Sequence, residues 1–171
     1  MRHTIAVLVK DHPGVLARVA GLFTRRRFNI ESIAVGHTEK IGVTRMTIVV
    51  GGDERVLEQI IKQLNKLIDV IRARDLSPQN SIERELALIK VHTDSLAARS
   101  EIIQLVEIFR ANVVDVERHA LTIETTGTED KVNAIVKLLE PFGLLEIVRT
   151  GKIALSRGLQ TIVSRGRSTK P

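Results

Sequence analysis

Apolar residues along the chain follow two patterns, short continuous runs and stripes at helical spacing. The run from Ile5 to Val9 is apolar throughout and is bounded by polar residues and turn formers, which predicts a buried strand. Pro13 fits the first turn of a following helix, because its missing N–H has no partner there in any case. The apolar positions of that predicted helix are Val15, Leu16, Val19, Leu22 and Phe23.

Three further strands and one further helix complete this first part of the chain. β-branched residues fill Asn29–Val35 and Thr44–Val50, and the short polar segment between them fits an antiparallel hairpin. Asp53 follows two glycines and is a favourable cap for a helix with apolar positions from Val56 to Leu67. Asp69–Arg74 is the last predicted strand, so the predicted order is βαββαβ.

The same order recurs after a segment rich in turn residues. The stretches GGDERVLEQIIKQL and TGTEDKVNAIVKLL match at several positions, among them Gly52 with Gly127 and Ile60 with Ile135. This internal repeat predicts an α+β protein of two tandem ferredoxin-like domains, each with helices on one face of an antiparallel sheet. The predicted boundaries are 1–76 for the first domain, 77–84 for a linker, 85–158 for the second domain and 159–171 for a basic, mobile tail.

Composition limits the class of protein. Hydrophobic residues make up 43% of the chain and charged residues 27%, as in globular proteins, and no apolar run approaches the roughly 20 residues that cross a bilayer. The chain has no cysteine, so disulfides and thiolate metal sites are excluded. We therefore expect a cytoplasmic protein that does not bind membranes.

The net charge of +6 raises the possibility of a nucleic-acid partner, but its distribution argues against one. Four of the cations lie in residues 156–171, which contain no acid, and only +2 remains for the rest of the chain. RNA-recognition motifs share the βαββαβ order and stack bases on aromatic side chains of their strands. Here aromatic residues are 2% of the chain, without tyrosine or tryptophan, and we expect no nucleic-acid binding.

Catalytic and metal-binding signatures are absent from the sequence. The five histidines have no metal-ligand spacing, and no GxSxG, Walker or GxGxxG motif occurs. No nucleophile lies beside a candidate base. We expect no catalytic residue, no metal site and no cofactor in this chain.

The turn Lys10-Asp11-His12-Pro13-Gly14 joins the first strand to the first helix and allows two interpretations. It can be a tight structural turn in which Gly14 permits close packing. Alternatively, Gly14, Val15 and Leu16 direct free backbone N–H groups at a small anion, helped by the helix dipole and by the missing Cβ of the glycine.

The first repeat resembles an ACT domain, an amino-acid-binding regulatory module, in the stretch DHPGVLARVAGLFTRRRFNIESIAVGHTE. Over most of its length the chain resembles the family of small regulatory subunits of acetolactate synthase (acetohydroxyacid synthase). Three further stretches carry this resemblance: VTRMTIVVGGDERVLEQIIKQLNKLIDVIRARDL, ERELALIKV and ALSRG at 154–158.

The resemblance implies feedback control of branched-chain amino acid biosynthesis. A separate catalytic subunit, which uses thiamine diphosphate, magnesium and FAD, would be activated by this chain and made sensitive to valine. The effector would lie between the ACT domains of a homodimer. The site residues implied are Asp11, Gly14, Val15 and Leu16 from one copy and Asn29 and Ile30 from the other; many relatives have asparagine in place of Asp11.

The residues themselves are compatible with that interface. In a ferredoxin-like sheet the second strand is an edge, and pairing two such edges about a twofold axis closes both. The apolar side chains of Val15, Leu16 and Ile30 suit a branched aliphatic effector. The second repeat has His92-Thr93-Asp94-Ser95 in place of the glycine turn, so we expect dimerisation or contact with the catalytic subunit there rather than effector binding. The alternative function is a free-standing amino-acid sensor, for example of transcription, although no helix-turn-helix is evident.

Overall fold

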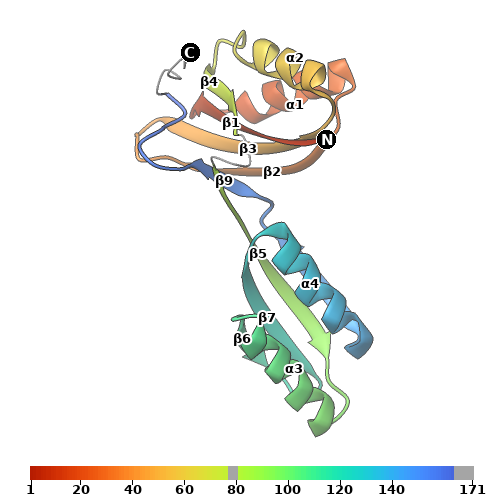
Figure 1. Cartoon of the computed structure of the whole chain (residues 1–171). Coiled ribbons are helices and arrows are strands. Elements are labelled where there is room, and N and C mark those ends of the chain that lie inside the picture. The colour runs from red at the N-terminus through yellow and green to blue at the C-terminus, as the bar shows by residue number, and fades with distance from the viewer. Residues whose placement is uncertain (77–80, 164–171) are drawn as a thin grey trace. The chain divides into compact units, whose positions relative to one another are not determined.

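The computed structural model describes residues 1–76 and 81–163. They form two compact units (Figure 1). Unit 1 contains Met1–Ile82 together with the described residues from Lys152 onward, and unit 2 contains Glu83–Gly151. The second repeat is therefore inserted between two parts of unit 1.

Unit 1 has a four-stranded antiparallel sheet in the order β2-β3-β1-β4, with helices α1 and α2 on one face (Figure 1). Its elements are β1 Arg2–Lys10, α1 Val15–Arg26, β2 Ile30–His37, β3 Val43–Gly51, α2 Glu54–Leu64 and β4 Val70–Asp75. The register of the central pair places Ile5 opposite Ile48. The predicted ferredoxin-like order is confirmed, and β2 is an edge strand.

Strand β1 is buried on both of its faces. Because side chains alternate across a strand, Ile5, Val7 and Val9 face the helices and join the main core of this unit. Ala6 and Leu8 face the opposite side and belong to a second apolar cluster. The continuous apolar run of β1 thus reflects cover on both faces of the sheet.

The cover on the second face is provided by the C-terminal segment. Residues 152–163, here termed the strap, begin with the short strand β9, Ile153–Ser156. Ala154 and Ile162 are 6% and 5% exposed and pack with Ala6 and Leu8 of β1. This differs from the predicted boundaries, which assigned 152–158 to the second domain and 159–163 to a mobile tail. The remaining tail residues, 164–171, and linker residues 77–80 lie outside the described part of the chain.

Unit 2 repeats the architecture with the sheet order β6-β7-β5-β8. Its elements are β5 Ser81–His92, which starts in unit 1, α3 Leu96–Ile108, β6 Asn112–Val116, β7 Ala120–Gly127, α4 Glu129–Leu139, a short 3₁₀ helix Glu140–Phe142 and β8 Leu144–Arg149. Its core lies between the sheet and the helices and contains Ile89, Ile102 and Ile135. The predicted α+β class with two βαββαβ units is confirmed.

Helix caps follow the sequence at three of the four α-helices. The side chains of Asp53, Ser95 and Thr128 accept hydrogen bonds from the first turns of α2, α3 and α4, as such residues favour. Helix α1 instead begins after Gly14, so Pro13 precedes the cap rather than occupying the first helical turn. None of the helices in 1–76 and 81–163 has the length and apolar character needed to cross a bilayer.

The second core gives a direct test of the packing. Ile135→Ala removes a fully buried side chain of α4, and we expect a loss of about 2–5 kcal/mol in the free energy of unfolding. Leu138→Ala, on the same helix but 45% exposed, is the matched control and is expected to cost far less. Urea unfolding followed by circular dichroism measures both, and equal losses for the two variants would contradict this packing.

Candidate functional site

The turn between β1 and α1 is open at its glycine. Gly14 has φ 88° and ψ −10°, the left-handed conformation, which a residue with a Cβ adopts only at a cost. A Cβ added there would meet no atom within 4 Å. A ligand therefore has direct access to the backbone at this position.

The first amides of α1 are available as donors. Val15 N–H makes only a long contact of 3.5 Å with His12 O, whereas Arg18 N–H donates normally to Gly14 O at 3.0 Å. For the N–H groups of Leu16 and Ala17 there is no acceptor among residues 1–76 and 81–163. Gly14 offers no side chain to cap them. Free amides at a helix N-terminus attract anions through hydrogen bonding and the helix dipole.

The buried carboxylate of Asp69 stabilises this turn. Asp69 precedes β4 and is 6% exposed, and its Oδ1 lies 2.9 Å from His12 Nε2. Its other carboxylate oxygen accepts a hydrogen bond from the guanidinium of Arg18 on α1. The backbone O of Asp69 accepts from Lys10 N–H at 2.9 Å. One residue thus fixes the end of β1, the turn and the first part of α1.

The ionisation of Asp69 follows from these contacts. Burial on its own raises the pKa of this carboxyl, but the hydrogen bonds and positive charges of His12 and Arg18 outweigh burial. The resulting pKa lies below the ordinary value of 3.8, so the group is ionised at neutral pH.

Asp11 connects the turn to the hairpin between β2 and β3. Its N–H donates to Gly42 O at 2.9 Å. Its carboxylate lies 3.3 Å from His37 Nδ1, in a pair of which the histidine side chain is 86% exposed. Because this pair is so exposed, the backbone bond is the firmer of the two links.

The structure brings together only part of the predicted set. Asp11, Gly14, Val15 and Leu16 share the turn, but the Val15 side chain is 3% exposed and belongs to the core. Val15 therefore offers its backbone alone, contrary to the expectation that its side chain lines the site. Leu16 is 48% exposed and is the available apolar side chain.

Asn29 and Ile30 lie at the other end of α1. Asn29 is exposed just before the edge strand β2, and Ile30 begins that strand and packs partly against the core. Helix α1 has 12 residues, which corresponds to about 18 Å along its axis. Within one copy these two residues are thus far from Gly14, and a site that joins both sets requires a second copy.

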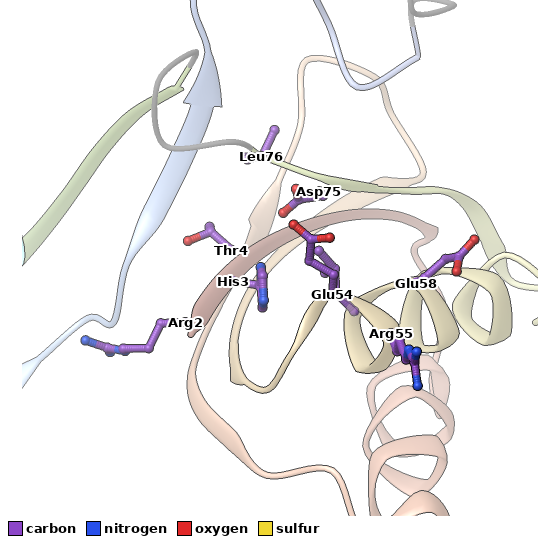
Figure 2. A pocket seen from close by; sticks show the side chains of 9 residues that line it. Arg2, His3, Thr4, Glu54, Arg55, Glu58, Asp75 and Leu76 are labelled. Carbon is purple, nitrogen blue, oxygen red and sulfur yellow. The ribbon is translucent and has the colours of Figure 1, made fainter.

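Figure 2 shows a different hollow of about 580 Å³ in unit 1. Its lining comes from the starts of β1 and α2 and the end of β4: Arg2, His3, Thr4, Glu54, Arg55, Leu57, Glu58, Asp75 and Leu76. Burial raises the pKa of Asp75, and the charge of His3 opposes this rise. Cations and carboxylates are mixed along the wall of this hollow, and the mixture matches no single class of ligand. Nowhere in the described residues do three or more His, Asp or Glu side chains form a group that could hold a metal ion.

Comparison with known proteins identifies the family of this chain. Residues 5–72 match the AHAS small subunit-like ACT domain, and residues 84–158 match a family described as the small subunit of acetolactate synthase. The chain is 58% identical to the probable acetolactate synthase small subunit of Methanothermobacter thermautotrophicus, over 94% of this chain and 95% of that protein. It is 56% identical to the acetolactate synthase small subunit of Mycobacterium bovis, over 91% of this chain and 92% of that protein.

The chain belongs to the acetolactate synthase small-subunit family. A crystal structure of the acetolactate synthase small subunit from Thermotoga maritima superposes with a TM-score of 0.87 at 46% identity, covering 92% of this chain and 98% of that one. The family resemblance stated from the sequence is thereby confirmed, as is the ACT assignment of the first repeat.

Within this small-subunit chain the two repeats differ at the equivalent turn. Ser95 caps α3, and its Oγ accepts from Ala98 N–H at 3.1 Å. The corresponding amide in the first repeat, that of Ala17, is free within the described residues. In addition, Gly143 takes the place of Asp69, because His92 N–H donates to Gly143 O just as Lys10 N–H donates to Asp69 O. The second repeat therefore lacks both the open turn and its supporting carboxylate.

Asp69 was not among the residues selected from the sequence, and its role is testable. Asp69→Asn should lower the thermal unfolding midpoint at about pH 7, since His12 and Arg18 lose their anionic partner. A lowered folded-state pKa means that the carboxylate stabilises unit 1 above pH 3.8 and loses this effect as the pH falls through the folded-state pKa.

The difference between wild type and Asp69→Asn should therefore shrink on acidification to about pH 3. Asp94→Asn, at the equivalent turn of unit 2 and 78% exposed, serves as the control and should change little. A pH-independent difference, or none at pH 7, would show that Asp69 does not hold the turn.

Proposed function

We propose that this chain is the regulatory subunit of acetolactate synthase in branched-chain amino acid biosynthesis. It activates a separate catalytic subunit and confers feedback inhibition by valine, which binds at the interface of two first domains. The family assignment favours this function over a free-standing amino-acid sensor. Inhibition requires that valine bind one state of the holoenzyme better than another, and a coupling of about 1–3 kcal/mol is sufficient.

The observation that supports this proposal most strongly is the open N-terminus of α1. The carboxylate of an amino acid is a small anion that fits the free N–H groups of Leu16 and Ala17 beside the left-handed Gly14. The half-exposed Leu16 offers an apolar surface to an aliphatic side chain. Asp11 lies on the same turn, and its carboxylate pairs with the ammonium group in competition with His37.

Edge strand β2 supports the dimeric part of the proposal. Its outer backbone groups have no neighbouring strand in the sheet order β2-β3-β1-β4, and Val35 on this strand is 49% exposed. Pairing of two β2 strands about a twofold axis extends the sheet across both copies. In that arrangement Asn29 and Ile30 of one copy approach the glycine turn of the other and complete the site.

The catalytic chemistry belongs to the partner in this proposal. The catalytic subunit binds thiamine diphosphate, magnesium and FAD and converts pyruvate to 2-acetolactate. This chain supplies binding energy and conformational control, and we propose no cofactor or catalytic residue in it. Its place of action is the cytoplasm, with its catalytic partner.

Gly14→Asp tests the proposed carboxylate site. The new carboxylate lies where that of valine would bind, so valine inhibition should be lost while activation of the catalytic subunit persists. Acetolactate formation is measured with the matching catalytic subunit at increasing valine concentrations.

Gly14→Asn is the matched control. Asparagine has the size of aspartate and also tolerates the left-handed region, but it is neutral. Inhibition should largely persist in this variant, although binding weakens. Equal valine sensitivity of Gly14→Asp and wild type would refute the site.

Asn29→Ala tests the contribution of the second copy. Loss of one polar contact should weaken valine binding by about 0.5–1.5 kcal/mol, measured by calorimetry on the purified chain. Asn112→Ala, at the start of the equivalent edge strand β6, is the control and should leave the affinity unchanged. Wild-type affinity in Asn29→Ala would remove this residue from the site.

A further inference from the structure

The strap is attached to unit 1 by apolar contacts and by hydrogen bonds, and its strand β9 pairs with β5. Arg45 on β3 donates to Ala154 O at 2.6 Å, and Arg74 on β4 donates to Thr161 O at 3.2 Å. Lys152 N–H donates to Ser32 Oγ of the edge strand β2 at 3.2 Å. With the packing of Ala154 and Ile162 against β1, the strap thus contacts all four strands of the sheet that carries the candidate site.

The attachment of the strap is incomplete. Its apolar anchors are Ala154 and Ile162, whereas Leu155 is 58% exposed and Leu159 is 100% exposed. A cavity of about 580 Å³ lies between the strap, from Leu155 to Val163, and the hairpin residues from His37 to Lys40. Few buried contacts and an adjacent cavity are features of a segment that opens more easily than the core.

The hairpin between β2 and β3 joins the strap to the glycine turn. On one side Val43 packs against the apolar cluster that contains Ala154 and Ile162. On the other side Gly42 O accepts the N–H of Asp11, the first residue of the turn. Asp11 and His37 form a second link between turn and hairpin. Displacement of the hairpin therefore changes the surroundings of both the strap and the turn.

The environment of Arg45 strengthens this connection. Burial lowers the pKa of its guanidinium, and the carboxylate of Glu39 on the hairpin opposes that shift. No carboxylate among the described residues forms an ion pair with Arg45 within 4.0 Å, and its hydrogen bond goes to the backbone O of Ala154. A half-buried cation that depends on a strap carbonyl favours the docked strap, since undocking removes this acceptor.

We propose that docking of the strap on unit 1 and effector binding at the Gly14 turn are positively coupled through the β2–β3 hairpin. An effector that orders the turn then favours the docked strap, and a docked strap raises the affinity for the effector to the same extent. The strap follows directly on unit 2, which ends at Gly151. This coupling rests on the proposed function for the identity of its effector, valine.

Variants of the full-length chain test the coupling in complex with the catalytic subunit. Ile162→Ala removes a buried anchor, and Arg45→Met removes the donor to Ala154 O. Each should raise the valine concentration for half-inhibition about fivefold or more, while activation without valine is unchanged. Leu159→Ala, on the same strap but fully exposed, is the matched control and should behave as wild type.

Hydrogen exchange without effector gives a second readout. Ile162→Ala should accelerate exchange of the Asp11 amide, which donates to Gly42 O, and of the amides in residues 37–43, and Leu159→Ala should not. Valine added to wild type should slow exchange in residues 153–162. Wild type without valine inhibition would overturn the proposed function alone, because the effector-free exchange still tests the strap–turn link. Unchanged half-inhibition in Ile162→Ala, or unchanged exchange at Asp11, would overturn the coupling.

Discussion

The left-handed conformation of Gly14 is the constraint on which the candidate site depends. It turns the chain from β1 into α1 without a side chain, so the amides of Leu16 and Ala17 have no capping partner within the described residues. An uncapped turn of this kind needs other contacts to keep its conformation. The ion pairs and backbone hydrogen bond of Asp69 provide these contacts from the buried side. The second repeat has a capped helix and no such carboxylate, which indicates that the two similar folds serve different roles.

Because of the strap, the boundary between the two packed units differs from the boundary between the two sequence repeats. The match to the small-subunit family ends at residue 158, yet the described residues 152–163 pack with the first domain. Sequence similarity therefore divides the chain between the two repeats. Packing instead divides it into unit 1, which consists of two separate parts of the chain, and unit 2, which is inserted between them. Unit 2 is joined to unit 1 at both of its ends, through strand β5 and through the strap.

The helices, the strands and much of the Gly14 turn could be predicted from the sequence, because each depends on residues that are close together in the chain. Asp53 was identified as a cap from its neighbours, and helical spacing identified the buried faces of the helices. The strap was missed, although β1 carried a signal for it. The first strand is apolar on both faces, whereas β5 alternates and exposes Lys90, so only the first sheet required a second cover. Asp69 was missed because its partner His12 lies 57 residues away, a contact that no local pattern reveals.

The central claim is that free amides of the first helix bind the carboxylate of a branched-chain amino acid. Its most direct test is a titration of the ¹⁵N-labelled chain with valine, in which backbone amide resonances are followed by NMR. The account predicts that the largest downfield proton shifts occur at Leu16 and Ala17 and that the amide of Ala98, which Ser95 caps, is unaffected. Shifts confined to other regions at saturating valine, or the absence of any shift, would contradict it.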